Sequence, residues 1–360
     1  MNDTHTFSSL PVAGFSTDLS KSRIPLEELL PGGPAKDGIP AIDHPRFIGV
    51  TAAQQWLKPQ EPVIALAGEQ SAKAYPLQIL IWHEMVNDHF EGQPVLVTFC
   101  PLCYSALVFG RRVGSYTLDF GVSGMLRHSD MIMYDRQTES LWQQFTGEAV
   151  VGSLTDQRLA VLPSQIMSFE QFYTQYPEGH VLSRETGFER DYGRNPYRGY
   201  DDVSQRPFRF EGETDPRLPP MEKVLGLHFN GQSKAYPYRL TRQQRVIVDQ
   251  VGDQPVVIFH LDGAVSALDA GSIADSREAG TTGVFDPVHQ GQMLSFEWHK
   301  GQVRDRQTGT VWSATGHGLS GPLRGQQLRL LPYGDYFAFA WLVFRPDSQV
   351  YTLNNGDEAP

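Results

Sequence analysis

The sequence has only two cysteines in 360 residues, and they lie three positions apart at Cys100 and Cys103. A closed site with four thiolate ligands is therefore excluded. The pair directly follows an apolar run at 94–99, which predicts a buried strand. Two thiols at this spacing can bind one metal ion or close a redox disulfide. Any sulfur chemistry of this protein must take place here, so residues 100–103 are the first candidate for a functional site.

Positive charge and long apolar runs are also scarce. The chain has 30 Lys and Arg against 41 Asp and Glu, a formal charge of −11, which repels nucleic acid. The longest strongly apolar run, 337–344, is too short to cross a bilayer. The first residues have neither the basic nor the apolar region of a signal peptide. We expect a cytoplasmic protein without nucleic-acid or membrane partners, although a leader already removed would leave no trace.

Motifs that bind nucleotides are absent from the sequence. No Walker-type or dinucleotide-binding glycine loop occurs, so no nucleotide cofactor is expected. The stretch at 121–124, Gly-Val-Ser-Gly, lacks the pattern of an α/β-hydrolase nucleophile elbow. Hydrophobic content of 40% and charged content of 20% are typical of a globular protein, and the length allows two domains.

What the sequence does contain is an internal repeat. Ala-Lys-Ala-Tyr-Pro at 72–76 returns as Ser-Lys-Ala-Tyr-Pro at 233–237, an offset of 161 (234 − 73). Asp-Arg-Gln-Thr at 135–138 returns at 305–308, and a tryptophan follows each time. This order predicts a duplication. Residues kept in both copies are expected to serve the fold, with the Asp-Arg-Gln-Thr element as a turn and the tryptophans in the core.

The duplication sets the predicted architecture. We expect a β-rich α+β fold of two pseudo-symmetric halves packed together. The predicted segments are an extended N-terminal arm (1–49), a first repeat (50–182), a connecting loop rich in Tyr, Arg and Gly (183–219), a degenerate second repeat (220–354) and a tail (355–360). The composition of the connecting loop fits a structural strap and part of a substrate pocket equally well.

Only the first repeat carries the thiols. At the offset of 161, Cys100, Cys103, His83 and Glu84 fall on Leu261, Ala264, Gln244 and Arg245. We therefore expect the functional site in the first repeat and interpret the second repeat as its structural partner.

Periodicity predicts the main elements. Helices are expected at 77–90 and 168–176. Asp-Gly at 262–263 signals a hairpin in the second repeat, which predicts that the cysteines occupy a tight turn between two strands. The expected strands are 63–66, 95–99, 106–109, 116–120, 256–260, 293–298 and 337–344.

Five long motifs carry a resemblance to a known family. They are Trp-His-Glu-Met-Val-Asn-Asp at 82–88, Thr-Phe-Cys-Pro-Leu-Cys at 98–103, Phe-Gly-Val-Ser-Gly-Met-Leu-Arg-His-Ser-Asp at 120–130, Met-Tyr-Asp-Arg-Gln-Thr-Glu-Ser-Leu-Trp at 133–142 and Asp-Tyr-Gly-Arg-Asn-Pro-Tyr at 191–197. The chain from about residue 24 resembles the widespread prokaryotic family called domain of unknown function 3179. The resemblance implies no activity. His128 departs from the family pattern, where asparagine is expected, so a ligand role for it would not be general.

The leading interpretation is a metal site. Cys-Pro-x-Cys in a turn is similar to the knuckles of rubredoxins and zinc ribbons, and one knuckle supplies only two ligands. His83 is the preferred third ligand because it occurs only in the first repeat and lies just before the cysteine strand; His128 and Asp130 come next, followed by His89. Sulfur with imidazole suits zinc or copper. The predicted metal ligands are Cys100, Cys103, His83 and His128, with Glu84 and Asp130 as the catalytic groups that move a proton.

Two other interpretations stay open. The thiols could form a redox pair without metal, or they could act as small buried apolar residues beside a pocket. The leading function is a metal-dependent enzyme, redox or hydrolytic, acting on a small molecule. The alternative is a metal-free dithiol redox or small-ligand-binding protein. Arg127 and Arg194 are candidates for binding an anionic substrate, and Tyr197 is a third substrate-binding candidate.

Overall fold

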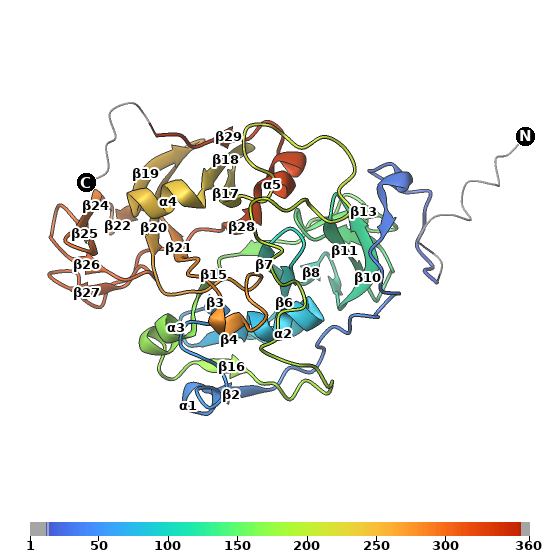
Figure 1. The fold of residues 1–360 in the computed structure, drawn as a ribbon, viewed down its shortest axis with the longest axis horizontal. Coiled ribbons are helices and arrows are strands. Elements are labelled where there is room, and N and C mark those ends of the chain that lie inside the picture. Colours follow the sequence, from blue (N-terminus) through green and yellow to red (C-terminus); the bar gives the residue numbers. More distant parts are fainter. Residues whose placement is uncertain (1–11, 13, 354–360) are drawn as a thin grey trace, which may run out of the picture.

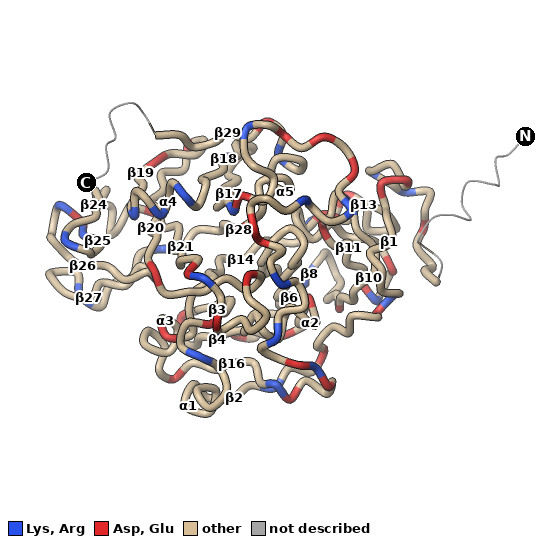
Figure 2. Tube along the Cα trace, in the orientation of Figure 1, with Lys and Arg blue, Asp and Glu red and all other residues tan. Residues whose placement is uncertain are grey.

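The computed structural model describes residues 12 and 14–353, and the predicted tail at 355–360 lies outside the described residues. The fold is β-rich with few and short helices, as the sequence predicts (Figure 1). Acidic and basic residues are interspersed along the whole trace, so the acidic excess is not gathered on one element (Figure 2). Within the described residues, no helix combines the length and apolarity needed to cross a membrane. The cytoplasmic location stays a prediction.

The first half contains a mixed sheet, two antiparallel sheets and a small hairpin. The mixed sheet, in the order β15-β3-β4-β16-β2, consists of β2 (Phe47–Gly49), β3 (Pro62–Ala67), β4 (Ala72–Pro76), β15 (Gln165–Ser168) and β16 (His180–Leu182). The sheet β14-β7-β6-β5 consists of β5 (Met85–Phe90), β6 (Gln93–Cys100), β7 (Ser105–Gly110) and β14 (Val161–Leu162). The sheet β1-β10-β11-β12-β13 consists of β1 (Leu30–Pro31), β10 (Phe120–Arg127), β11 (Asp130–Asp135), β12 (Leu141–Gln143) and β13 (Glu148–Val151). The remaining elements are β8 (Arg112–Val113), β9 (Tyr116–Thr117), η2 (Leu26–Glu28), α1 (Val50–Ala53), α2 (Leu77–His83) and α3 (Phe169–Gln175).

The elements of the second half follow in a similar order. One sheet, β28-β17-β18-β29, consists of β17 (Lys223–Phe229), β18 (Gln232–Pro237), β28 (Gly334–Phe337) and β29 (Gln349–Val350). The next, β19-β20-β21, consists of β19 (Val246–Val251), β20 (Gln254–Leu261) and β21 (Thr281–Phe285). The sheet β24-β25-β26-β27 consists of β24 (Phe296–His299), β25 (Gln302–Asp305), β26 (Val311–Trp312) and β27 (Gly318–Ser320). The remaining elements are β22 (Val288–His289), β23 (Gln292–Met293), η3 (Ile273–Asp275), α4 (Tyr238–Gln244) and α5 (Ala338–Phe344).

Several local arrangements occur in both halves. Strand β16 runs parallel to β4, and β29 runs parallel to β18. The indole of Trp142 donates to Asp135 at 2.9 Å, and that of Trp312 donates to Asp305 at 3.0 Å. Each of these aspartates also accepts from a backbone N–H three residues on, so the predicted turn is confirmed. The two small sheets, β10–β13 and β24–β27, lie at opposite ends of the long axis (Figure 1).

One apolar core joins the two halves. Buried side chains from residues 41–182 and from 218–342 belong to the same cluster. The ring of Phe145 lies 4.5 Å from Tyr336 and 4.6 Å from Phe344, measured between centroids. The predicted core tryptophans, Trp142 and Trp312, are 0% and 1% exposed.

The predicted helix at 77–90 is too long. Helix α2 ends at His83, and Glu84 takes a left-handed conformation with φ of 59°. Residues 85–90 instead pair along their whole length with β6. The apolar positions that resembled one helical stripe therefore belong to two elements, because a short stripe does not reveal where a chain reverses direction. The helix predicted at 168–176 is confirmed as α3, and Ser168 and Gln171 form its capping box.

Two other predictions for the second half are wrong. The expected strand at 337–344 is mostly helix α5, whose first five residues are all buried. A short apolar run covered on every side gives no period by which helix and strand differ. The expected hairpin at 262–263 is also absent, because β20 pairs with β21 only after the long segment 262–280. The strands predicted at 116–120 and 293–298 are each interrupted.

Candidate metal centre in the first half

The two cysteines lie in the turn between β6 and β7. Cys100 is the last residue of β6 and pairs with Ser105, the first residue of β7, so four residues close the turn. The predicted tight turn is confirmed. Pro101 has a fixed φ and no N–H to satisfy, which suits a turn position. Cys100 and Cys103 are 1% and 0% exposed, and both are free thiols.

Asp130 reaches the cysteines from a second hairpin. It opens β11 directly after His128 and Ser129, which have φ of 51° and 63°. Left-handed backbone costs a residue other than glycine about 1–2 kcal/mol. The matching turn in the second half, between β24 and β25, is Lys300-Gly301 with φ of 50° and 81°, so glycine takes the place of Ser129 only. Such strain is typical of functional sites, where the surrounding structure holds a residue in position.

Three potential metal ligands meet at this point. One ligand atom each from Cys100, Cys103 and Asp130 lies within 4.8 Å of the other two. The thiol of Cys103 donates to Asp130 Oδ1 at 2.9 Å. The other oxygen, Oδ2, accepts from Gln143 Nε2 at 2.5 Å and from the backbone N–H of Phe145 at 2.9 Å. These two hydrogen bonds fix the carboxylate with Oδ1 toward the sulfur atoms.

Burial controls the protonation of this cluster. Asp130 is 0% exposed, and its desolvation raises the pKa of the carboxyl group to about 6, although hydrogen bonds from Cys103, Phe145 and Gln143 act in the opposite direction. Burial, followed by the neighbouring Cys100 and Asp130, raises the pKa of the Cys103 thiol well above its usual range. Without a bound cation, the protonated thiol is therefore favoured.

Glu84 is a second buried acid beside the cluster. It follows the last residue of α2 and is 7% exposed. Burial raises its carboxyl pKa to about 8, and the charge of Asp130 adds to the shift. Among the described residues, no side chain or backbone group donates a hydrogen bond to this carboxyl group. A carboxyl group with this pKa can hold or release a proton near neutral pH.

Glu84 lines a cavity of about 260 Å³. Most of the wall is apolar, and Tyr197 and Tyr200 of the connecting loop form part of it. The hydroxyl of Tyr200 donates to the carbonyl oxygen of Leu102 at 3.0 Å, so the loop is held against the cysteine turn. The loop therefore contributes to a pocket. The lining residues are Gly32, Pro34, Ile39, Glu84, Leu102, Val122, Gly124, Met125, Leu126, Met131, Tyr197, Tyr200 and Phe208.

The two histidines predicted as ligands lie apart from this cluster. His83 is 0% exposed, and its ring nitrogens contact the carbonyl of Pro40 and the hydroxyl of Tyr192, each at 2.7 Å. His128 Nε2 lies 3.4 Å from Glu28 Oε2. Neither belongs to the group of three ligand atoms found among the described residues.

The three predicted substrate-binding residues have different surroundings. Arg127 pairs with Glu28 at 2.6 Å and donates to Gln143 Oε1 at 3.3 Å, so it contacts the residue that holds Asp130. The side chain of Arg194 is 70% exposed and lies 3.7 Å from Asp191. Of the three, only Tyr197 lines the cavity.

Gln143 and Tyr200 are site residues that the sequence reasoning missed. Gln143 follows the repeated tryptophan, and Ser313 follows Trp312 in the second half. The cysteines were chosen as candidates because the second repeat lacks them. The same criterion could have identified Gln143. Tyr200 had only the composition of the connecting loop as a signal.

Fold and site together describe a β-rich protein with a buried thiol–carboxylate cluster beside a small cavity. The chain belongs to the family of proteins of unknown function DUF3179, whose model matches residues 36–348. The family predicted from the motifs is confirmed. Comparison with curated proteins and with solved structures gives no match.

Proposed function

We propose that this protein is a metal-dependent enzyme that acts on a small molecule in the 260 Å³ cavity, with Cys100, Cys103 and Asp130 as the metal ligands. The convergence of these three ligand atoms carries the proposal. Asp130 takes the place that the sequence predicted for a histidine. Three protein ligands leave the fourth position of a tetrahedral zinc site open for water or substrate.

The donor set suits zinc. Thiolate sulfur binds zinc and copper(I) well, and carboxylate oxygen also occurs in zinc sites. Zinc held here would polarise a substrate oxygen and lower the pKa of bound water. Because zinc has no redox chemistry, hydrolysis is favoured over oxidation. Gln143 and Phe145 would orient the carboxylate ligand from outside, as supporting hydrogen bonds do in metal sites.

Glu84 is the proposed proton carrier. It lines the same cavity, and its pKa of about 8 suits a group that accepts a proton from water or donates one to a leaving group near neutral pH. Tyr197 lies close enough to Glu84 for the carboxylate to raise the tyrosine pKa, after burial, so the neutral phenol is favoured as a hydrogen-bond donor to substrate. The apolar wall limits the entry of water.

A dithiol function without metal is the second candidate. The Cys103 thiol donates to Asp130, so the carboxylate could accept the thiol proton. However, a reactive thiol needs a lowered pKa and access for its oxidant. Burial gives Cys103 a raised pKa and no exposure, so the metal site is favoured.

We also propose that the two halves arose by duplication and that only the first has the thiol–carboxylate cluster. The shared order of elements and the matching Trp–Asp hydrogen bonds support this. Where the first half has Asp130 at the start of β11, the second half has Gln302 at the start of β25.

Elemental analysis tests the metal proposal. Protein purified without a metal-affinity tag should contain about one equivalent of zinc. Cys103→Ser and Asp130→Asn should each reduce bound zinc at least about 10-fold, because each removes one of three ligands. His83→Gln is the matched control and should keep its zinc.

Two results would contradict this ligand set. If His83→Gln lost its metal and Asp130→Asn kept it, the ligand set predicted from the sequence, with His83 in place of Asp130, would be supported. Metal-free protein with two thiols that oxidise reversibly would favour the dithiol function.

A further inference from the structure

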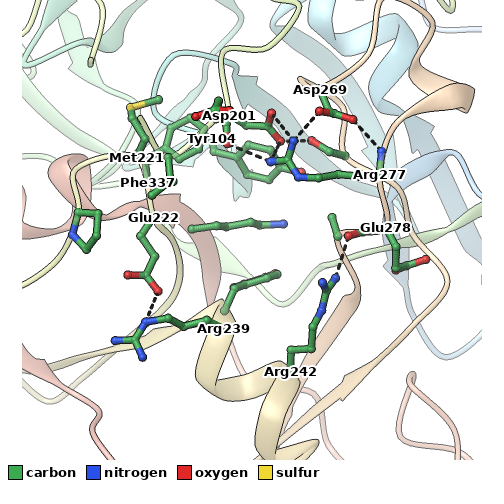
Figure 3. Close-up of a pocket in the computed structure, with 17 residues that line it drawn as sticks. Tyr104, Asp201, Met221, Glu222, Arg239, Arg242, Asp269, Arg277, Glu278 and Phe337 are labelled. Carbon is green, nitrogen blue, oxygen red and sulfur yellow. Dashed lines mark hydrogen bonds and ion pairs between the residues drawn. The ribbon is translucent and has the colours of Figure 1, made fainter. Parts of the chain in front are cut away.

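A second, larger cavity of about 830 Å³ adjoins the end of the cysteine turn (Figure 3). Tyr104, the residue after Cys103, forms part of its wall. The connecting loop contributes Asp201, and the second half contributes Lys223 at the start of β17 and Arg242 of α4. The cavity is separate from the proposed metal centre, and its volume falls within the usual range of small-molecule sites.

The wall depends on a segment found only in the second half. Four residues join β6 to β7, whereas residues 262–280 join β20 to β21. Long connections inside a compact fold are often functional. This segment is well anchored, because Arg277 pairs with Asp201 at 2.8 Å and with Asp269 at 2.6 Å. It thus forms a fixed wall of the cavity.

Lys223 is the unusual cation in this cavity. Its Nζ lies 4.2 Å from the ring centroids of both Tyr104 and Tyr238. Among the described lysines, Lys223 is the half-buried one without a carboxylate within 4.0 Å; the others either pair with a carboxylate or are exposed. Burial lowers the pKa of its ammonium group, Asp335 and Asp201 raise it, and Arg242 and Arg277 lower it further.

The acidic groups around Lys223 have other partners. Arg277 pairs with Asp201 and Asp269, as above, and Arg239 pairs with Glu222 at 2.9 Å. Asp335 accepts hydrogen bonds from Tyr238 and Thr282. Glu278 Oε1 accepts from the backbone N–H groups of Gly263 at 3.0 Å and Gly280 at 2.7 Å. Asp202 accepts from Ser204.

Arg242 is a second cation without a carboxylate partner. It donates to the backbone carbonyl of Glu278 at 2.8 Å, and in Figure 3 its side chain runs upward from the helix toward Glu278. Within the described part of the chain it forms no ion pair. Arg239, one turn earlier on α4, points away toward Glu222 in the same view. Lys223 and Arg242 are therefore the cations of this cavity whose charge a ligand could balance.

We propose that this cavity binds a small organic anion, whose charged group contacts Lys223 and Arg242. Its apolar part would lie against Met221 and Phe337, which also line the cavity and lie across the view from Arg242 in Figure 3. An ammonium group over two aromatic rings and a guanidinium donor together suit a carboxylate or a phosphate ester. The site does not depend on the metal centre.

Pyridoxal 5′-phosphate is a suitable probe because it carries both an anion and a lysine-directed aldehyde. The Lys223 amine would add to the aldehyde with loss of water, and borohydride would reduce the resulting imine to a stable secondary amine. Peptide mass spectrometry then reports the labelled lysine. We expect Lys223 to react at least about 10-fold faster than the exposed Lys58 and Lys300, with a rate that saturates as probe increases.

The charge requirement is tested separately. Phenyl phosphate or benzoate should slow the labelling of Lys223, and the relative effect of the two identifies the preferred anion. Arg242→Gln should weaken probe binding about 5-fold or more, whereas Arg239→Gln, its neighbour with a carboxylate partner, should change it less than 2-fold. Cys103→Ser should label like the wild type, which separates this site from the metal centre.

Three results would overturn the anion site. Lys223 could react no faster than Lys58 and Lys300, it could react equally well with pyridoxal that lacks the phosphate, or both competitors could leave its labelling unchanged. Each of these can be measured on the wild-type protein, so the outcome does not depend on whether a variant folds.

Discussion

At the scale of single residues, left-handed backbone marks the surroundings of the proposed metal centre. Glu84, Tyr104, His128 and Ser129 all have φ between 51° and 63°. At Glu84 and His128 this conformation belongs to the fold, because the equivalent residues of the second half, Arg245 and Lys300, have φ of 62° and 50°. At Ser129 the second half has glycine instead. Ser129 therefore costs the first half stability that glycine would not, directly next to Asp130. This is the pattern expected of a site under functional constraint.

Glu84 should make the stability of the metal-free protein depend on pH. Its folded pKa of about 8 lies above its ordinary value of 4.5, so the folded state binds more protons between these values. Stability is therefore fully present below pH 4.5 and falls as the pH rises toward 8. From pH 6 to pH 8 the wild type should lose about 2 kcal/mol more than Glu84→Gln, since one pKa unit corresponds to about 1.4 kcal/mol.

Urea unfolding of both proteins at pH 6 and pH 8, with metal removed by chelator, measures this difference. Asp130 is present in both proteins, so the effect of its titration on the free energy of unfolding largely cancels when the two are compared. Equal pH dependence in the two proteins would mean that Glu84 has an ordinary pKa, and its role as proton carrier would lose its support.

At the scale of elements, a matched contact joins the strand before the helix in each half, β4 or β18, to the strand after it, β5 or β19. Asp88 Oδ2 accepts from Lys73 Nζ and Tyr75 Oη, each at 2.7 Å. Asp249 Oδ2 accepts from Lys234 at 2.6 Å and from Tyr236 at 2.8 Å. The sequence predicted an architectural role for these repeated Lys and Tyr residues, and their position between strands agrees with it.

Asp88→Asn and Asp249→Asn should both destabilise the protein, by about 1–3 kcal/mol, because each leaves a lysine without its counter-charge. The loss should be larger for Asp88, which is buried, than for the half-buried Asp249. Chemical denaturation gives the free energy of unfolding, and zinc content serves as the control. A strong loss of zinc in either variant, with folding intact, would show that this contact belongs to the site and not to the scaffold alone.

At the scale of the whole molecule, the halves share one core, and the candidate sites depend on that contact. The backbone N–H of Phe337, from β28, donates to the carbonyl of Cys103 at 2.9 Å. Phe145, whose N–H holds Asp130, packs on Tyr336 and Phe344. The second half therefore supports the cysteine turn even though it lacks the cysteines.

Phe145→Ala should lower the free energy of unfolding by about 3–5 kcal/mol, because it removes a large ring from the shared core. Both wild type and variant should unfold in a single transition that tryptophan fluorescence and far-UV circular dichroism report at the same urea concentration. Two separated transitions would mean that the halves are stable independently of each other.

Much of the candidate site could be predicted from the sequence where the information is local. The cysteine turn follows from a strand of apolar residues and the Cys-Pro spacing. The α3 capping box follows from Ser168 and Gln171. Comparison of the repeats pointed to Glu84 as well as the cysteines. These features depend on a few neighbouring residues, so short patterns record them.

The third ligand and the second cavity were decided only by tertiary structure. His83 precedes the cysteine strand, but the N-terminal arm supplies Pro40 and the connecting loop supplies Tyr192 to occupy its nitrogens. Asp130, which the sequence ranked behind His83 as a ligand and favoured as a proton carrier, comes within reach of the sulfur atoms through a separate hairpin. The Asp-Gly pair at 262–263 predicted a hairpin, but it opens a long segment whose residues Ser266, Asp269 and 277–279 line the second cavity. The sequence by itself determined the family, the β-rich class and the position of the thiols. Only the packing of distant segments determined what surrounds them, because burial and partner distances are properties of the folded chain.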